Sequence, residues 1–162
     1  LVDTEKMAIE EINAAGGIVV DGKSYKIKYK VEDGASNWDL FAEKSSQMID
    51  KGYPVVFGGW TSASRKKMLP VYEAMDGFLY YPIQYEGREC SPNIMYTGAT
   101  PNQQSEPATD FMFKRSPAAG KPFYLVGSDY VFPRTSNTIT REQLKTLGGK
   151  VVGEDYLPLG NT

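Results

Sequence analysis

The sequence predicts an α/β protein organised around a parallel sheet. Short runs of β-branched and aromatic residues alternate with amphipathic stretches along the 162-residue chain. Such short apolar runs are typical of strands that are buried between helical layers. Glycines or prolines close most of the elements. Repeated strand–helix units of this kind favour a parallel sheet with helices on both faces.

The expected helices begin near capping residues and mostly end at glycines. Asn37 can cap the second helix, and Pro101 suits the first turn of the fourth. Pro70 lies inside the third helix and predicts a kink or an early break, because proline has no backbone N–H group. The helices are expected over residues 4–15, 38–51, 62–74, 101–113 and 134–147.

The expected strands follow two patterns. Residues 25–31 alternate strictly between apolar and polar side chains, as a half-exposed strand does. Other runs are apolar throughout and are expected to be buried strands: 54–57, 78–81 and 123–126. Further strands are expected over 93–97 and 151–156.

Composition and charge argue against several classes of function. The formal net charge of -2 offers no electrostatic attraction to nucleic acid or to an anionic membrane. No apolar run approaches the ~18 residues that a membrane span requires, so no membrane insertion is expected. The chain has no histidine, a single cysteine (Cys90) and no glycine-rich phosphate motif. We therefore expect no catalytic centre, metal or cofactor.

Three loops lie where open α/β sheets bind ligands, beyond the carboxyl ends of strands. They span residues 58–64, 82–87 and 127–133. In the first loop, Ser62 opens a helix whose free backbone N–H groups suit a carbonyl or carboxylate oxygen. Spacing alone favours a simpler interpretation, in which Ser62 and Ser64 only cap the helix.

The other two loops are rich in hydrogen-bonding side chains. Gln84 can donate and accept, Tyr85 can do either, and ionised Glu86 only accepts. An exposed turn explains this loop equally well. In the third loop, Asp129 and Tyr130 stand at the carboxyl end of a strand, where Asp129 alone is more typical of a loop or cap carboxylate.

Several long segments together identify a family resemblance. They resemble the urea-binding substrate-binding proteins of ABC transporters, within the branched-chain-amino-acid group of type I periplasmic binding proteins. A cytoplasmic amide-sensing regulator of amidase expression belongs to the same wider group. The segments are EEINAAGGI, DLFAEKSSQMID, VVFGGWTSASRK, LYYPIQYEG, YTGATPNQQ, FYLVGSDYVFPRT and LKTLGGKVVGEDYLPLG.

The resemblance implies a type I periplasmic-binding-protein fold with two Rossmann-like lobes of parallel sheet flanked by helices. Members are more than twice this length, so the chain would be a fragment that lacks the first strand and most of the second lobe. Residues 1–103 would form most of lobe 1, residues 104–121 the hinge or crossing region, and residues 122–162 the start of lobe 2.

The resemblance also implies that the three loops contact a ligand between the lobes. The amide sensor carries Tyr where this chain has Phe132, so a hydroxyl contact there does not transfer and Tyr130 is the remaining phenol. The implied ligand-binding residues are Trp60, Thr61, Ser62, Tyr81, Gln84, Tyr85, Glu86, Tyr130 and Phe132.

The function implied is capture of urea, or of a related short-chain amide such as acetamide or formamide, for delivery to the membrane subunits of an ABC permease. Such a protein is periplasmic or lies at the cell surface. Two alternatives stay open, a cytoplasmic amide-sensing regulator and an amide-cleaving enzyme. The enzyme is disfavoured because the residues supply no nucleophile–base pair.

Overall fold

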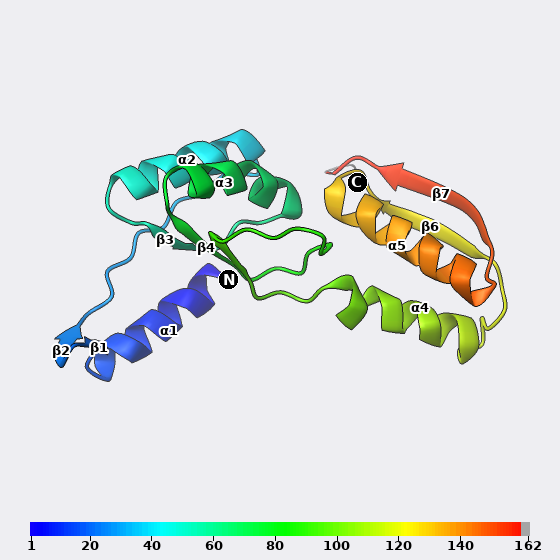
Figure 1. Cartoon of the computed structure of the whole chain (residues 1–162), viewed down its shortest axis with the longest axis horizontal. Coiled ribbons are helices and arrows are strands. Elements are labelled where there is room, and N and C mark those ends of the chain that lie inside the picture. Colours follow the sequence, from blue (N-terminus) through cyan, green and yellow to red (C-terminus); the bar gives the residue numbers. More distant parts are fainter. Residues whose placement is uncertain (160–162) are drawn as a thin grey trace.

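A three-stranded parallel sheet organises the first part of the chain. The computed structural model describes residues 1–159. The sheet has the order β3–β4–β5, and α2 and α3 lie together over one of its faces (Figure 1). The elements of this part are α1 (Val2–Ala14), β1 (Ile18–Val20), β2 (Lys23–Tyr25), α2 (Trp38–Asp50), β3 (Val55–Phe57), α3 (Ser62–Ala74), β4 (Phe78–Tyr81) and β5 (Ile94–Tyr96).

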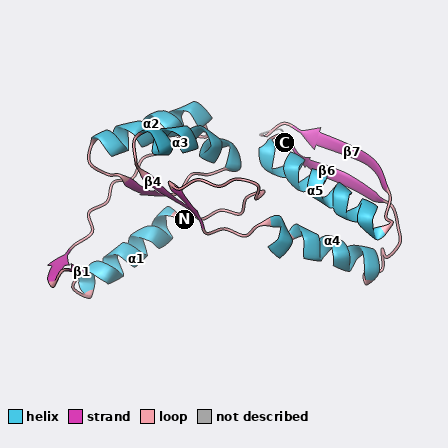
Figure 2. Ribbon diagram, viewed as in Figure 1, coloured by secondary structure: helices cyan, strands magenta, loops and turns pink. Residues whose placement is uncertain are grey.

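The second part repeats the strand–helix–strand unit. Strands β6 and β7 are parallel neighbours, α5 connects them, and α4 lies beside α5 (Figure 2). Its elements are η1 (Pro101–Gln103), α4 (Ser105–Lys114), β6 (Phe123–Ser128), α5 (Val131–Leu147) and β7 (Val151–Leu157). The expected α/β class with parallel sheets flanked by helices is confirmed. The lobe boundaries at 103 and 121 stay a prediction, and residues 160–162 of the expected second lobe lie outside the described residues.

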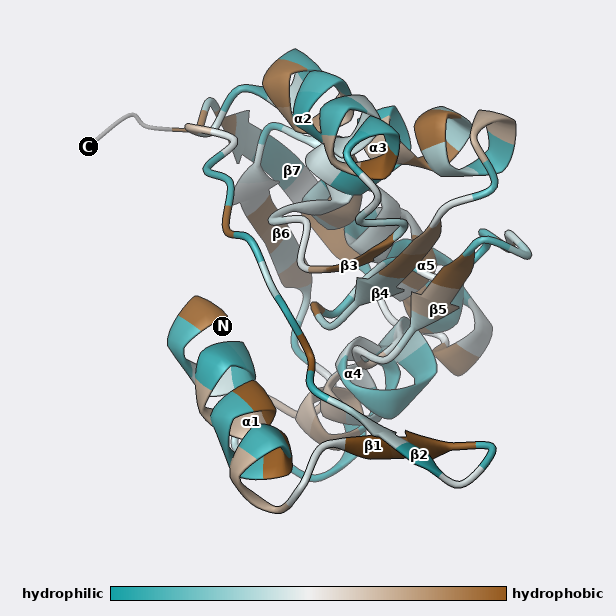
Figure 3. Cartoon of the chain, turned by 90° about the vertical axis from the view of Figure 1, so that its left-hand side faces the viewer, coloured by the Kyte–Doolittle hydropathy of each residue, from teal (hydrophilic) through white to brown (hydrophobic). Residues whose placement is uncertain are grey.

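The core of the first part lies between α3 and the sheet. Met68 and Tyr72 of α3 pack against Leu79 and Tyr81 of β4 and Ile94 of β5. Figure 3 shows hydrophobic residues concentrated on strands β3–β5. Burial of these apolar side chains supplies the main stabilisation of the layer and holds the N-terminus of α3 beside the end of β4.

Local signals in the sequence explain several helix ends. The Asn37 side chain accepts hydrogen bonds from the backbone N–H groups of Asp39 and Leu40, so α2 starts as predicted. Gly148 ends α5 in the left-handed conformation that glycine adopts without strain. The early break expected at Pro70 does not occur, because α3 continues to Ala74.

Two helix starts differ from the expectation. Helix α5 begins at Val131, three residues earlier than predicted, so Pro133 lies inside its first turn, where the missing N–H group costs no intrahelical bond. Pro101 starts only a short 3₁₀ turn, and α4 follows separately from Ser105.

The strand predicted over residues 25–31 is wrong. Residues 26–34 form no strand; instead β1 and β2 form an antiparallel hairpin that ends at Tyr25. Beyond the hairpin no neighbouring strand pairs with this segment, and the Asn13 side chain bonds both the N–H and the C=O of Ile27. The dipeptide Asp21-Gly22, a strong two-residue hairpin turn signal, could have revealed the hairpin.

The burial predicted for two strands is also wrong. In β3, Val55 and Phe57 are 48% and 53% exposed, because β3 is an edge strand with α-helices on one face only. Phe57 stacks on Tyr80 at a centroid distance of 4.6 Å on the uncovered face. In β6, Tyr124 and Val126 are exposed while Leu125 is buried.

Within residues 1–159, no helix combines the length and apolar character needed to cross a bilayer.

Replacing the helix cap tests the local account of α2. We expect Asn37→Ala to lower the free energy of unfolding by about 1 kcal/mol, because two N–H groups lose their acceptor. In thermal unfolding this corresponds to a melting temperature about 2–4 °C lower for a chain of this size. Asn37→Ser is the matched control and should melt close to wild type. Equal losses in both variants would contradict the capping role.

Candidate functional site

The loop that connects β3 to α3 places Ser62 at the start of the helix. The N-cap is Thr61, whose Oγ1 accepts from the N–H of Ala63 at 3.3 Å. The expectation that Ser62 caps this helix is therefore wrong, because the helix begins one residue earlier than a Ser62 cap requires. Ser62 is almost fully buried, and its hydroxyl does not cap the helix. Trp60 precedes this turn and is 60% exposed.

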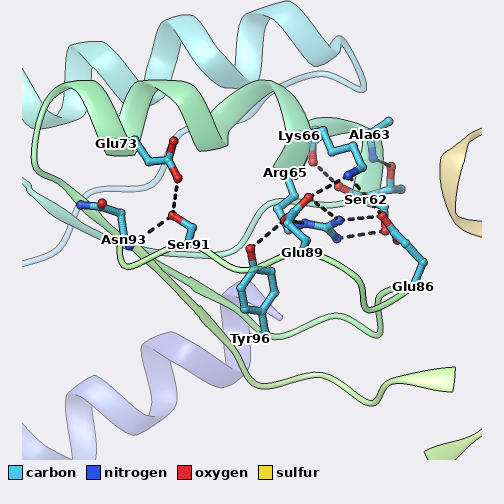
Figure 4. Close-up of polar contacts among 12 residues, drawn as sticks. Ser62, Ala63, Arg65, Lys66, Glu73, Glu86, Glu89, Ser91, Asn93 and Tyr96 are labelled. Atoms are coloured by element: carbon cyan, nitrogen blue, oxygen red, sulfur yellow. Dashed lines mark hydrogen bonds and ion pairs between the residues drawn. The ribbon is translucent and has the colours of Figure 1, made fainter. Parts of the chain in front are cut away.

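Arg65, one turn along α3, is the centre of a buried polar cluster. Its side chain is 0% exposed. Nη1 donates to Ser62 Oγ at 3.2 Å, and Nη2 donates to Glu86 Oε1 at 2.8 Å. Nε donates to Glu89 Oε1 at 2.7 Å. These contacts bind the helix start to the loop between β4 and β5 (Figure 4).

Three tyrosines surround the guanidinium of Arg65. The distances from its Cζ to the ring centroids are 4.9 Å for Tyr81, 5.3 Å for Tyr85 and 5.8 Å for Tyr96. Tyr85 also stacks on Tyr96 with centroids 4.5 Å apart. A cation close to aromatic faces is stabilised by their quadrupoles, most strongly where water is excluded. The rings therefore help to hold the guanidinium in one orientation.

Two buried oxygen atoms in this cluster have no hydrogen-bond partner among the described residues. One is Oε2 of Glu86, whose side chain is 3% exposed, and the other is the phenol oxygen of Tyr81, which forms no well-aligned hydrogen bond. Burial raises the pKa of this phenol, although Ser62 and Arg65 lie close enough to offset part of that rise. Unpaired buried polar atoms are uncommon in folded proteins and costly. Both atoms are thus candidates for binding a ligand that brings hydrogen bonds of its own.

The charges of the cluster compensate one another. Lys66 lies at its edge, where Nζ is 2.8 Å from Glu89 Oε2 and 3.7 Å from Glu86 Oε1. Two cations, Arg65 and Lys66, thus face two carboxylates, and their formal charges sum to zero. Burial opposes ionisation of Glu89, but hydrogen bonds from Arg65, Lys66 and Tyr96 outweigh it and lower the pKa of Glu89 to about 2.

The second part of the chain contributes Tyr130. This residue immediately precedes α5 and is half-buried. Burial, and to a lesser extent the Glu86 carboxylate, raises the pKa of the Tyr130 phenol. Phe132, in the first turn of α5, is also half-buried. Asp129 is exposed and pairs with Arg134 at 2.6 Å, in agreement with its interpretation as a loop carboxylate.

A further contact joins the loop after β4 to α5. Arg88 Nη2 lies 3.1 Å from Glu142 Oε2, and both side chains are largely exposed. The loop between β4 and β5 extends toward the second part of the chain, as its green trace shows (Figure 1). The loop that carries Glu86 therefore contacts the second part of the chain through Arg88.

The structure brings four of the nine residues expected to bind ligand together around Arg65. Ser62, Tyr81, Tyr85 and Glu86 surround Arg65, whereas Gln84 is exposed on the adjoining loop. The sequence reasoning missed four members of the cluster: Arg65, Lys66, Glu89 and Tyr96. Arg65 could have been found, since a residue three positions after Ser62 lies on the same helix face.

Two surface hollows lie away from this cluster. One runs beside β7 and is lined in part by Arg141, Lys145 and Glu154; Arg141 already pairs with Glu154. The other lies beside α4 and Gln143. Both are open to solvent. The buried cluster around Arg65 is the stronger candidate, because it combines enclosure with free hydrogen-bonding atoms.

A model of one protein family matches the whole chain. Residues 1–162 match the family described as periplasmic binding protein domain. The chain belongs to this family. A match of this extent agrees with the parallel sheets flanked by helices.

Solved periplasmic binding proteins have the same fold. A periplasmic binding protein from Burkholderia mallei superposes with a TM-score of 0.82 at 23% identity, over 96% of this chain and 42% of that one. LivJ from Streptococcus pneumoniae, in complex with isoleucine, superposes with a TM-score of 0.81 at 19% identity, over 96% of this chain and 43% of that one. A solute-binding protein from Rhodopseudomonas palustris, in complex with 3,4-dihydroxybenzoic acid, superposes with a TM-score of 0.79 at 23% identity, over 96% of this chain and 42% of that one. This chain thus spans less than half the length of these structures.

The depressed pKa of Glu89 predicts how acid affects stability. A carboxyl group with a folded-state pKa below its ordinary value stabilises the protein above that ordinary value and loses this contribution as pH falls. We expect part of the thermal stability to be lost between pH 4.5 and about pH 2. In Glu89→Gln this part of the pH dependence should disappear, whereas Glu43→Gln, at an exposed site on α2, should follow wild type. An unchanged slope in Glu89→Gln would refute the assignment.

Proposed function

We propose that this chain is the part of an extracytoplasmic solute-binding protein that captures urea, or a closely related short-chain amide, between two lobes. The observation that supports this most is the buried Oε2 of Glu86, near Ser62 at the N-terminus of α3, which has no hydrogen-bond partner within residues 1–159. A ligand with N–H donors would satisfy that atom, and a carbonyl oxygen would suit the start of the helix.

The hydrogen-bonding groups of urea match this arrangement. Urea is planar and presents one carbonyl acceptor and four N–H donors. We propose that Ser62 and the first N–H groups of α3 bind the carbonyl oxygen, while Glu86 and Tyr81 accept from the N–H groups. Tyr130 would close over the ligand from the second part of the chain, with Trp60, Thr61, Gln84, Tyr85 and Phe132 around the site.

The balance of charge supports an uncharged ligand. The two carboxylates of the cluster already have two cationic partners, so the site has no excess charge to offer an ion. An amino acid, such as the isoleucine bound by the Streptococcus pneumoniae protein, brings both an ammonium and a carboxylate. Those groups would need additional partners, and unpaired charges in a closed site are penalised strongly.

The family supports the rest of the proposed role. Several of the solved relatives are described as substrate-binding or solute-binding proteins of ABC transporters. We therefore propose that the protein works outside the cytoplasm and delivers its ligand to permease subunits in the membrane. The binding step involves no chemical conversion, and the proposal requires no cofactor.

Calorimetric titration of the full-length protein with urea tests this function. Four non-hydrogen atoms at a ceiling of about -1.5 kcal/mol each allow about -6 kcal/mol, or a dissociation constant of tens of micromolar. Acetamide and leucine are the comparison ligands. Tighter binding of acetamide would favour the amide-sensor alternative, and binding of leucine alone would contradict an amide ligand. Release of ammonia from urea or acetamide would favour the enzyme alternative.

Removal of the free carboxylate oxygen should weaken binding. We expect Glu86→Gln to raise the dissociation constant for urea at least ~10-fold, about 1.4 kcal/mol, because an amide NH₂ would replace an acceptor. Glu73→Gln removes the same charge from α3, where its carboxylate accepts from Ser91, and should bind urea like wild type. Equal affinity in wild type and Glu86→Gln would remove Glu86 from the site.

A pair of serines provides a second test at the helix start. Ser62→Ala should weaken urea binding by about 10-fold, because the carbonyl oxygen would lose a hydroxyl donor. Ser64 is equally buried, but its hydroxyl donates to the carbonyl oxygen of Thr61 at 2.7 Å. Ser64→Ala is therefore the matched control and should retain urea affinity. If the two variants bind alike, the proposed carbonyl contact is wrong.

A further inference from the structure

We propose that Arg65 is a specificity-determining positioning residue, which orients Ser62 as a donor and Glu86 as an acceptor and so selects an uncharged amide over a cation. This inference rests on the proposed function, because it concerns the same site. Arg65 itself faces three protein partners and need not touch the ligand. Its role is to fix Ser62 as a hydrogen-bond donor and Glu86 as a hydrogen-bond acceptor toward the ligand.

The contact with Ser62 sets the direction of one hydrogen bond. A guanidinium has only donors, so Ser62 Oγ must accept from Arg65 Nη1 at 3.2 Å. The hydroxyl proton of Ser62 then points away from Arg65. A serine hydroxyl has one proton to donate, and the neighbouring Tyr81 phenol is an acceptor for it that a ligand carbonyl would replace. Burial raises the pKa of that phenol, and Ser62 offsets part of the rise. Ser62 thus presents a donor that suits a carbonyl oxygen.

The contact between Arg65 and Glu86 sets the direction of a second hydrogen bond to the ligand. Arg65 Nη2 occupies Oε1 at 2.8 Å, and Oε2 is left without a partner among the described residues. A carboxylate oxygen can only accept. Arg65 therefore creates a donor at Ser62 next to an acceptor at Glu86. A carbonyl oxygen and an N–H group on one carbon, as in an amide, complement this pair.

The positive charge of Arg65 also favours a neutral ligand over a cation. Without it, Glu86 and Glu89 would face Lys66 alone, and the cluster would have a net negative charge. Such a site would favour a cation. Guanidinium is the informative probe, because it is planar and similar in size to urea but has N–H donors only and a positive charge.

Lysine could supply the charge of Arg65 but not its geometry. The guanidinium holds Ser62, Glu86 and Glu89 at once through three different nitrogen atoms. A lysine ammonium is a single point of charge on a flexible stem and cannot reproduce this fork. Arg65→Lys thus separates orientation from charge, whereas Arg65→Met removes both.

The experiment titrates the full-length protein with urea and, separately, with guanidinium chloride at millimolar concentrations, with sodium chloride as the salt control. We expect wild type to prefer urea. Arg65→Lys should bind urea at least about 10-fold more weakly with little change toward guanidinium, and Arg65→Met should shift the preference toward guanidinium by at least about 10-fold. Lys67→Met removes a cation from α3 that pairs with Asp39, outside the cluster, and should keep the wild-type preference.

Circular dichroism and thermal melting establish that the variants fold; if Arg65→Met does not fold because two buried carboxylates lose their partner, Arg65→Lys decides the question. Wild-type affinity for urea in Arg65→Lys would overturn the inference, as would equal losses for both ligands that leave the preference unchanged. If wild type itself binds neither urea nor acetamide, the proposed function fails and this inference fails with it.

Discussion

The buried guanidinium of Arg65 is the constraint on which the rest of this site depends. A charge in a protein interior is tolerated only when it is compensated and its hydrogen bonds are satisfied. Here that requirement brings together the first turn of α3, the loop after β4 and the end of β5, through Ser62, Glu86, Glu89 and Tyr96. The geometry of the candidate site follows from the way in which one cation is satisfied.

The need to compensate the charge of Arg65 also constrains the conformation of the loop between β4 and β5. Glu86 and Glu89 turn toward α3, while Arg88, between them, reaches Glu142 on α5. One short segment therefore contacts both parts of the chain. Under the function proposed above, this segment would carry both the ligand-facing groups and the contact between the two parts of the chain.

A small neutral ligand is recognised by the direction of its hydrogen bonds, because it offers little apolar area and no charge. Recognition of this kind requires donors and acceptors that cannot exchange roles when the wrong ligand arrives. A hydroxyl group is ambiguous by itself, whereas a hydroxyl that already accepts from a guanidinium is not. The tyrosines around Arg65 reinforce this by restricting the orientation of the cation.

The sequence by itself determined the parallel α/β class, the order of the elements after residue 37 and the loops proposed to form the site. These depend on short-range chemistry, such as the cap at Asn37, the stop at Gly148 and the apolar runs of β3 and β4. Only the tertiary structure decided that residues 26–34 form no strand, that β3 is half-exposed and that Thr61 rather than Ser62 caps α3. Those outcomes depend on which strand lies alongside and on where a helix begins to pack. The role of Arg65 belongs to the same class, because its carboxylate partners lie more than twenty residues away in the chain and meet it only when the sheet and α3 have assembled.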